Sequence, residues 1–75
     1  MSENGHEFSA STLQAVMERF DWETASPRQR AVFRQIVGPM YFYEKSTGEI
    51  ARELSISPQS VRTTLEKLRR DLEES

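Results

Sequence analysis

Two helix-start signals only eleven residues apart constrain the C-terminal half of this chain more than any other feature. Ser46-Thr47-Gly48-Glu49 is a capping box, in which the serine and glutamate side chains each satisfy a backbone N–H that the helix leaves free. Ser57-Pro58 opens a second helix, because proline is favoured at the first helical position. The apolar residues behind these starts recur at helical spacing: Ile50, Ala51 and Leu54, then Val61, Leu65, Leu68 and Leu72. Residues 46–72 are therefore predicted to form two helices joined by the turn Ser55-Ile56-Ser57, with Ile56 buried.

The first half of the chain predicts two more helices. Leu13, Val16, Met17 and Phe20 share one helical face, which indicates a helix from about Ser9 to Phe20. It should give way over residues 21–25, where Trp22 is expected to fill the core as a large apolar side chain. Ser26-Pro27-Arg28-Gln29 then starts a second helix in the same way as the later signals.

The end of that second helix is the least determined part of the sequence. Val32, Phe33, Ile36 and Val37 supply its buried face, and Gly38-Pro39 is expected to stop it. The aromatic run that follows, Met40 to Lys45, leaves three interpretations open: a loop packed on the core, a short extension of the helix, or an exposed contact patch.

Length and composition limit the fold class. Seventy-five residues suffice for one small domain, and the absence of cysteine excludes a disulfide or a cysteine-based zinc site. We expect a flexible N-terminal segment over residues 1–8 and a single all-α domain over 9–75, a bundle of about four helices. The chain has no apolar run of the roughly 18 residues that cross a membrane, and no signal peptide, so no membrane contact and a cytoplasmic location are expected.

The charges are distributed unevenly along a chain whose net charge is −2. Residues 1–26 hold five acidic side chains against Arg19 alone, and residues 71–75 hold three more. Between them, residues 27–70 contain nine of the ten basic side chains and only four acidic ones. A basic middle segment is typical of proteins that bind phosphate, although a mixed solvated surface is the other interpretation.

A short helix, a tight turn and a second capped helix together make a helix-turn-helix, whose second helix enters the major groove of DNA. Ala51 supplies the small side chain where the two helices cross. On the final helix, the residues that lie away from the apolar stripe are of types that read base edges. They are Gln59, Arg62, Thr63 and Glu66, with an Arg62–Glu66 pair as the alternative for Glu66. Arg69 and Arg70 leave two interpretations open, contact with phosphate or a complement of the helix dipole.

The segment Ser46 to Leu68, STGEIARELSISPQSVRTTLEKL, resembles the helix-turn-helix of region four of bacterial sigma factors and of LuxR-type regulator output domains. Ser26 to Val32 resembles the helix that precedes the motif there. The resemblance implies base contacts by Gln59, Arg62 and Thr63, and phosphate contacts by Thr47, Ser57, Ser60 and Lys67. Arg28 and Arg52 are further phosphate candidates from their charge.

The chain departs from that family pattern in three ways, which limit the function that the resemblance implies. Ser55 stands where the family usually has glycine, so a non-glycine residue must adopt a strained or altered backbone. The connection from Val37 to Ser46 is longer and more aromatic. If Met1 is the natural start, only 25 residues precede Ser26, too few for the other regions of a sigma factor. A small stand-alone transcription regulator, a repressor for example, is the resulting hypothesis.

One helix-turn-helix makes few base contacts, so we expect a homodimer on palindromic duplex DNA. Its interface is predicted at Met17 and Phe20, or at Tyr41, Phe42 and Tyr43. The alternative is a protein-interaction module that binds RNA polymerase, a sigma factor or another regulator without touching DNA. No catalytic set or metal-ligand spacing is evident, so neither an enzyme nor a cofactor or metal is expected.

Overall fold

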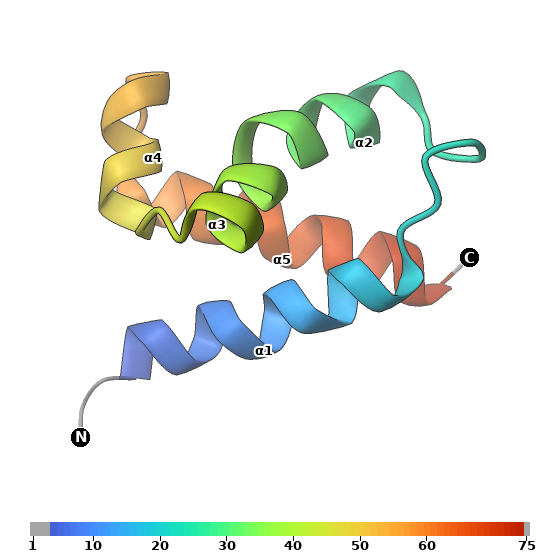
Figure 1. Ribbon diagram of the computed structural model, residues 1–75, viewed down its shortest axis with the longest axis horizontal. Coiled ribbons are helices and arrows are strands. Elements are labelled where there is room, and N and C mark those ends of the chain that lie inside the picture. Colours follow the sequence, from blue (N-terminus) through green and yellow to red (C-terminus); the bar gives the residue numbers. More distant parts are fainter. Residues whose placement is uncertain (1–3, 75) are drawn as a thin grey trace.

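The computed structural model describes residues 4–74, with side chains from Ser11 onward, and forms a small all-α bundle (Figure 1). Its elements are α1 (Asn4–Arg19), α2 (Pro27–Val32), the π-helical turn η1 (Phe33–Val37), α3 (Gly38–Tyr43), α4 (Thr47–Leu54) and α5 (Pro58–Glu74). Because α2, η1 and α3 follow one another without a break, the described chain contains four helical segments and no strand, as predicted. None of the helices in residues 4–74 is long and apolar enough to cross a membrane.

Helix α5 is the element on which the others pack. Figure 1 shows α1 running beside it in the same direction, α2 to α3 covering a further side, and α4 leaning across its beginning. The shared core includes residues from all four segments, and Val16, Val37, Ile50, Val61 and Leu65 are fully buried in it. Met40, Ile36, Ala51 and Leu68 complete the buried apolar set.

The predicted helix starts are confirmed by their hydrogen bonds. Ser26 accepts from the Gln29 N–H, and the Gln29 side chain accepts from the Ser26 N–H. Ser46 and Glu49 make the same reciprocal pair at the start of α4. Ser57 accepts from the Ser60 N–H at 3.1 Å, which caps the start of α5. Local sequence therefore determines where three of the helices begin.

Helix α1 begins at Asn4, earlier than the predicted start at Ser9. Once a helical turn exists, each further residue adds one hydrogen bond, so a helix can extend beyond the residues that form its apolar face. The predicted flexible segment 1–8 is thus helical from Asn4 on, and residues 1–3 of it lie outside the described residues.

The prediction that Trp22 fills the core is wrong. Its side chain is 42% exposed, and it lies edge-on to Phe20 and Phe33, which stack on each other with ring centroids 4.4 Å apart. Arg30 holds the turn by donating from Nε to the Trp22 carbonyl at 2.9 Å, with its guanidinium over the indole ring. The stacked phenylalanines fill the space, and Trp22 closes it from outside.

The expected stop at Gly38-Pro39 is also wrong, because the chain stays helical to Tyr43. The Gly38 N–H donates to the Phe33 carbonyl five residues back, so the backbone widens into a π-helical turn immediately before the proline. A proline ring clashes with an α-helical carbonyl four residues earlier and with the Cβ of the preceding residue. The wider turn and the missing Cβ of Gly38 relieve both clashes.

The aromatic run is both a helix extension and an exposed patch. Met40 is buried, whereas Tyr41, Phe42 and Tyr43 point outward, and Phe42 and Tyr43 are 62% and 75% exposed. The helix ends at Glu44, which takes a left-handed conformation (φ 55°, ψ 33°). The N–H groups of Glu44 and Lys45 both donate to the Pro39 carbonyl, which closes the last turn.

The turn between α4 and α5 carries the strain that the sequence indicated. Ser55 has φ 61° and ψ 41°, the left-handed conformation that glycine adopts without penalty. The neighbouring Ile56 is 40% exposed, so the prediction that it is buried is wrong. Its N–H donates to the Ala51 carbonyl at 2.9 Å, and the backbone rather than the side chain anchors the turn.

Replacing Ser55 with glycine should stabilise the protein. Glycine removes a left-handed penalty of about 1–2 kcal/mol, while its greater freedom in the unfolded chain costs about 0.5–1 kcal/mol, so the expected net gain is up to about 1.5 kcal/mol. Urea denaturation followed by circular dichroism measures it. Ser11→Gly, an exposed serine inside α1, is the matched control and should destabilise by about 0.5–1 kcal/mol. An equal loss in both variants would contradict the assignment of strain to Ser55.

Candidate nucleic-acid interface

Helices α4 and α5 pack against each other at a tight crossing. Ile50 and Ala51 of α4 are buried in the same core as Val61 and Leu65 of α5. The small Ala51 side chain allows the helices to approach, and its carbonyl also receives the Ile56 N–H. Since the apolar stripe of α5 faces this core, the opposite face of α5 is turned outward.

The four predicted base-reading residues lie together on that outward face. Gln59, Arg62, Thr63 and Glu66 line one shallow surface hollow, and Arg70 completes its lining. Gln59 donates from its amide to the Thr63 hydroxyl at 3.3 Å and accepts from Arg62 at 3.4 Å. These contacts are long and exposed, so the three side chains can exchange them for contacts with a ligand.

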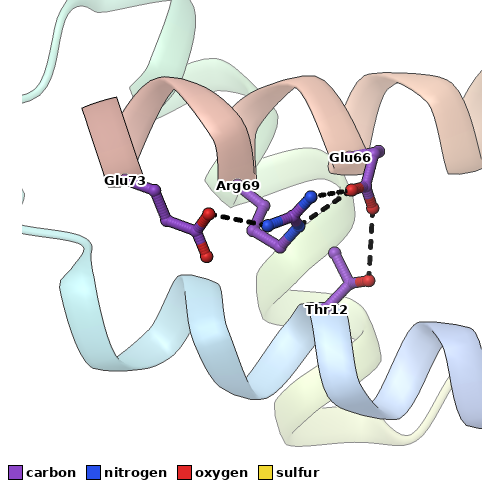
Figure 2. A network of polar contacts seen from close by, with 4 residues as sticks. All are labelled: Thr12, Glu66, Arg69 and Glu73. Atoms are coloured by element: carbon purple, nitrogen blue, oxygen red, sulfur yellow. Dashed lines mark hydrogen bonds and ion pairs between the residues drawn. The ribbon is translucent and has the colours of Figure 1, made fainter. Parts of the chain in front are cut away.

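Glu66 is engaged differently from its neighbours (Figure 2). Its Oε1 accepts from the buried Thr12 hydroxyl of α1 at 3.4 Å, and its Oε2 accepts from the Arg69 guanidinium, with Nε at 2.9 Å. Arg69 also pairs with Glu73 at 2.7 Å. The structure thus uses Glu66 to link α5 to α1, and its partner is Arg69 rather than Arg62. Arg69 belongs to this network and does more than complement the helix dipole.

The network keeps Glu66 ionised. The hydrogen bond from Arg69 is the largest cause that lowers the pKa of Glu66 below its ordinary value, and the attraction of the same guanidinium and the Thr12 hydrogen bond add to it against partial desolvation. A carboxylate whose oxygens are already occupied has less capacity to accept from a cytosine amino group. Of the four base candidates, Glu66 is therefore the one whose side chain is already engaged by other residues of the folded protein.

Two of the predicted phosphate contacts come together although they are 39 residues apart. Arg28 of α2 and Lys67 of α5 line one groove between these helices, with Thr63 and Thr64 between them. Lys67 has a loose ion pair with Asp71 at 3.8 Å, and Arg28 is exposed and forms no ion pair within the described part of the chain. Asp71 lines this groove as well, so beside the Gln59–Thr63 surface it carries two positive charges and one negative charge.

The remaining phosphate candidates lie on α4 and at the starts of α4 and α5. Ser57 donates from its hydroxyl to the Ser60 hydroxyl at 3.0 Å, so both serines belong to the cap of α5. Thr47 is half-buried in the first turn of α4, and Arg52 is exposed on the same helix. Helix N-termini attract phosphate through their free N–H groups and dipole, which suits Thr47, Ser57 and Ser60, whereas Arg52 lies in the last turn of α4 and offers its own charge.

The two predicted dimer surfaces differ in exposure. Met17 and Phe20 are partly buried and pack against the core, where Phe20 stacks on Phe33. Tyr41, Phe42 and Tyr43 are exposed at the end of α3. The structure therefore leaves the aromatic run more available for a partner than the apolar face of α1.

Arg70 lines the same hollow as the base-reading candidates, a position that the sequence interpretation did not assign to it. It lies eleven residues after Gln59, which is slightly more than three whole helical turns, so both residues are on one face of α5. Helical spacing contains this signal, but it can be used only when the helix is known to continue straight past Leu68.

Comparison of the chain with protein-family models, with curated proteins and with solved structures finds no match. Within residues 4–74, no group of three or more histidine or acidic side chains is arranged to hold a metal ion.

Glu66→Gln tests the α1–α5 link through its pH dependence. A carboxyl group with a lowered pKa in the folded state stabilises the protein above its unfolded pKa, and this contribution disappears as the pH falls through the folded pKa. The variant should be less stable by about 0.5–1 kcal/mol at neutral pH, and the gap should close as the pH falls below about 4.5.

The measurement is urea denaturation between pH 3 and pH 7. Glu74→Gln removes an exposed carboxylate at the end of the same helix and serves as the control, for which no comparable gap is expected. A pH-independent difference between wild type and Glu66→Gln would contradict the role assigned to the network.

Proposed function

We propose that this chain is a sequence-specific, double-stranded DNA-binding transcription regulator, a repressor for example, which places α5 in the major groove. It acts by binding rather than as an enzyme, and its place of action is the cytoplasm. The observation that carries the proposal is the outward face of α5. There Gln59, Arg62 and Thr63 form one polar surface beside the α4–α5 crossing.

The chemistry of this face supports base reading. Arginine bonds guanine with two donors, glutamine bonds adenine with a donor and an acceptor, and the threonine methyl group contacts thymine. The three side chains lie within the first two turns of α5, and the N-terminal residues of a recognition helix are those that reach base edges. Their mutual hydrogen bonds are weak enough to be replaced by base contacts.

The charges around this face support contact with phosphate. Arg28 and Lys67 border it on the α2 side, and Arg52 lies on the supporting helix α4. The acidic excess of the whole chain is placed in residues 1–26 and 71–75, at the ends of the sequence. A local positive surface on a protein of net negative charge limits nonspecific binding and favours a specific site.

A homodimer on a palindromic site fits the small number of base-reading side chains. A second copy doubles the contacts, and the two recognition helices would then read half-sites about 34 Å apart. Selection from a random duplex pool at near-physiological salt should recover a symmetric consensus with half-sites about one helical turn apart. An asymmetric consensus would refute the dimer, and no enrichment of any sequence would refute specific binding.

A second candidate function is favoured by the exposed aromatic end of α3. Phe42 and Tyr43 present apolar area that the domain does not use internally, and aromatic side chains are enriched at protein interfaces. The alternative is accordingly a module that regulates transcription by binding RNA polymerase, a sigma factor or another regulator without touching DNA.

Charge reversal separates the two candidates. Arg62→Glu combined with Lys67→Glu should weaken duplex binding at least about a hundredfold, because two attractive contacts become repulsive, and should abolish regulation of a reporter gene. Arg19→Glu with Arg34→Glu makes the same change in net charge at two exposed arginines outside α4 and α5, and should leave both readouts unchanged. Full regulation by the Arg62/Lys67 variant would favour the protein-binding alternative.

A further inference from the structure

The two neighbouring arginines near the end of α5 have opposite surroundings. Arg69 is only 25% exposed in its side chain and is held by Glu66 and Glu73. Arg70 is exposed and forms no ion pair with the acidic side chains described in residues 11–74. Arg69 is thus held within the fold, whereas Arg70 stays at the surface, where its charge also acts on the Glu66 carboxylate.

Arg70 belongs to the same surface as the base-reading residues. It lines the hollow that Gln59, Arg62, Thr63 and Glu66 also line, although it is eleven residues from Gln59. Eleven residues turn an α-helix through about 1100°, only about 20° more than three full turns. Gln59, Thr63 and Arg70 therefore follow one nearly straight strip along the outward face of α5.

The length of this strip determines which part of a DNA duplex Arg70, at its far end, can contact. From Gln59 to Arg70 the helix rises about 16 Å, and in a recognition helix the N-terminal residues are the ones that contact base edges. With Gln59 and Thr63 at the bases, Arg70 lies about three helical turns beyond Gln59, where its side chain can reach the sugar-phosphate backbone that borders the groove. A guanidinium is well suited to bind a phosphate there.

We propose that Arg70 is a further DNA contact of α5, which binds a backbone phosphate beyond the base-reading turns and positions the helix without reading sequence. This inference rests on the proposed DNA-binding function. In this proposal Arg70, at the far end of the strip, contributes to affinity for DNA of any sequence. Gln59 and Thr63, at its beginning, determine which sequence is preferred. Arg69, one residue earlier, has no such role because the Glu66 network holds it.

The test is Arg70→Ala, compared with wild type on the duplex recovered by selection and on an unrelated duplex. Loss of one phosphate contact removes about 0.9 from the slope of log K against log salt concentration, which corresponds to about fivefold weaker binding at 0.15 M salt. We expect this loss on both duplexes, with the selected consensus unchanged. Arg70→Lys keeps the charge and should retain most of the slope.

Arg34→Ala is the matched control, because Arg34 is an exposed arginine of η1 whose guanidinium lies over the Trp22 ring. Its affinity and salt slope should equal those of wild type, and circular dichroism verifies the fold of every variant. An altered consensus for Arg70→Ala would overturn the proposal in favour of a base contact, and unchanged affinity and slope would overturn it entirely. If wild type binds no duplex, the proposed function itself fails, a result distinct from either of these.

Discussion

The packing of α4 against α5 is the constraint on which the rest of the structure depends. Ile50 and Ala51 enter the same core as Val61 and Leu65, and the short Ala51 side chain keeps the two helices close. This contact requires a tight turn between the helices. The tight turn is possible only because Ser55 adopts a left-handed backbone conformation. A chain this small has little core to spare, so it accepts local strain at one residue to preserve the crossing.

The Thr12–Glu66–Arg69–Glu73 network gives α5 two functions at once. On its α1 side, α5 is part of the fold, because Glu66 links the two helices and Arg69 holds Glu66 in place. On its outward side it presents polar side chains to a ligand. Residues only one position apart on the helix, Arg69 and Arg70, are separated into these two groups by the 100° rotation between successive helical residues.

The accuracy of the sequence interpretation depends on how local the determining interactions are. Capping boxes at Ser26 and Ser46 involve residues three apart, so the sequence places these helix starts correctly. Gly38-Pro39 is a local signal too, but the helix continues past it through a π-helical turn. The packing of Ile36, Val37 and Met40 into the core stabilises this continuation, and the local signal does not contain that packing. Trp22 was misplaced because the stacked Phe20 and Phe33 already fill the space that it was expected to occupy.

The sequence by itself determined the helix starts, the apolar stripe of α5 and the outward position of Gln59, Arg62 and Thr63, because each follows from spacing within one helix. Only the tertiary structure decided which outward residues remain free. It engaged Glu66 through Thr12, 54 residues away, and brought Arg28 beside Lys67 across two helices. Such pairings depend on how helices are arranged in space, which periodicity within a helix does not encode.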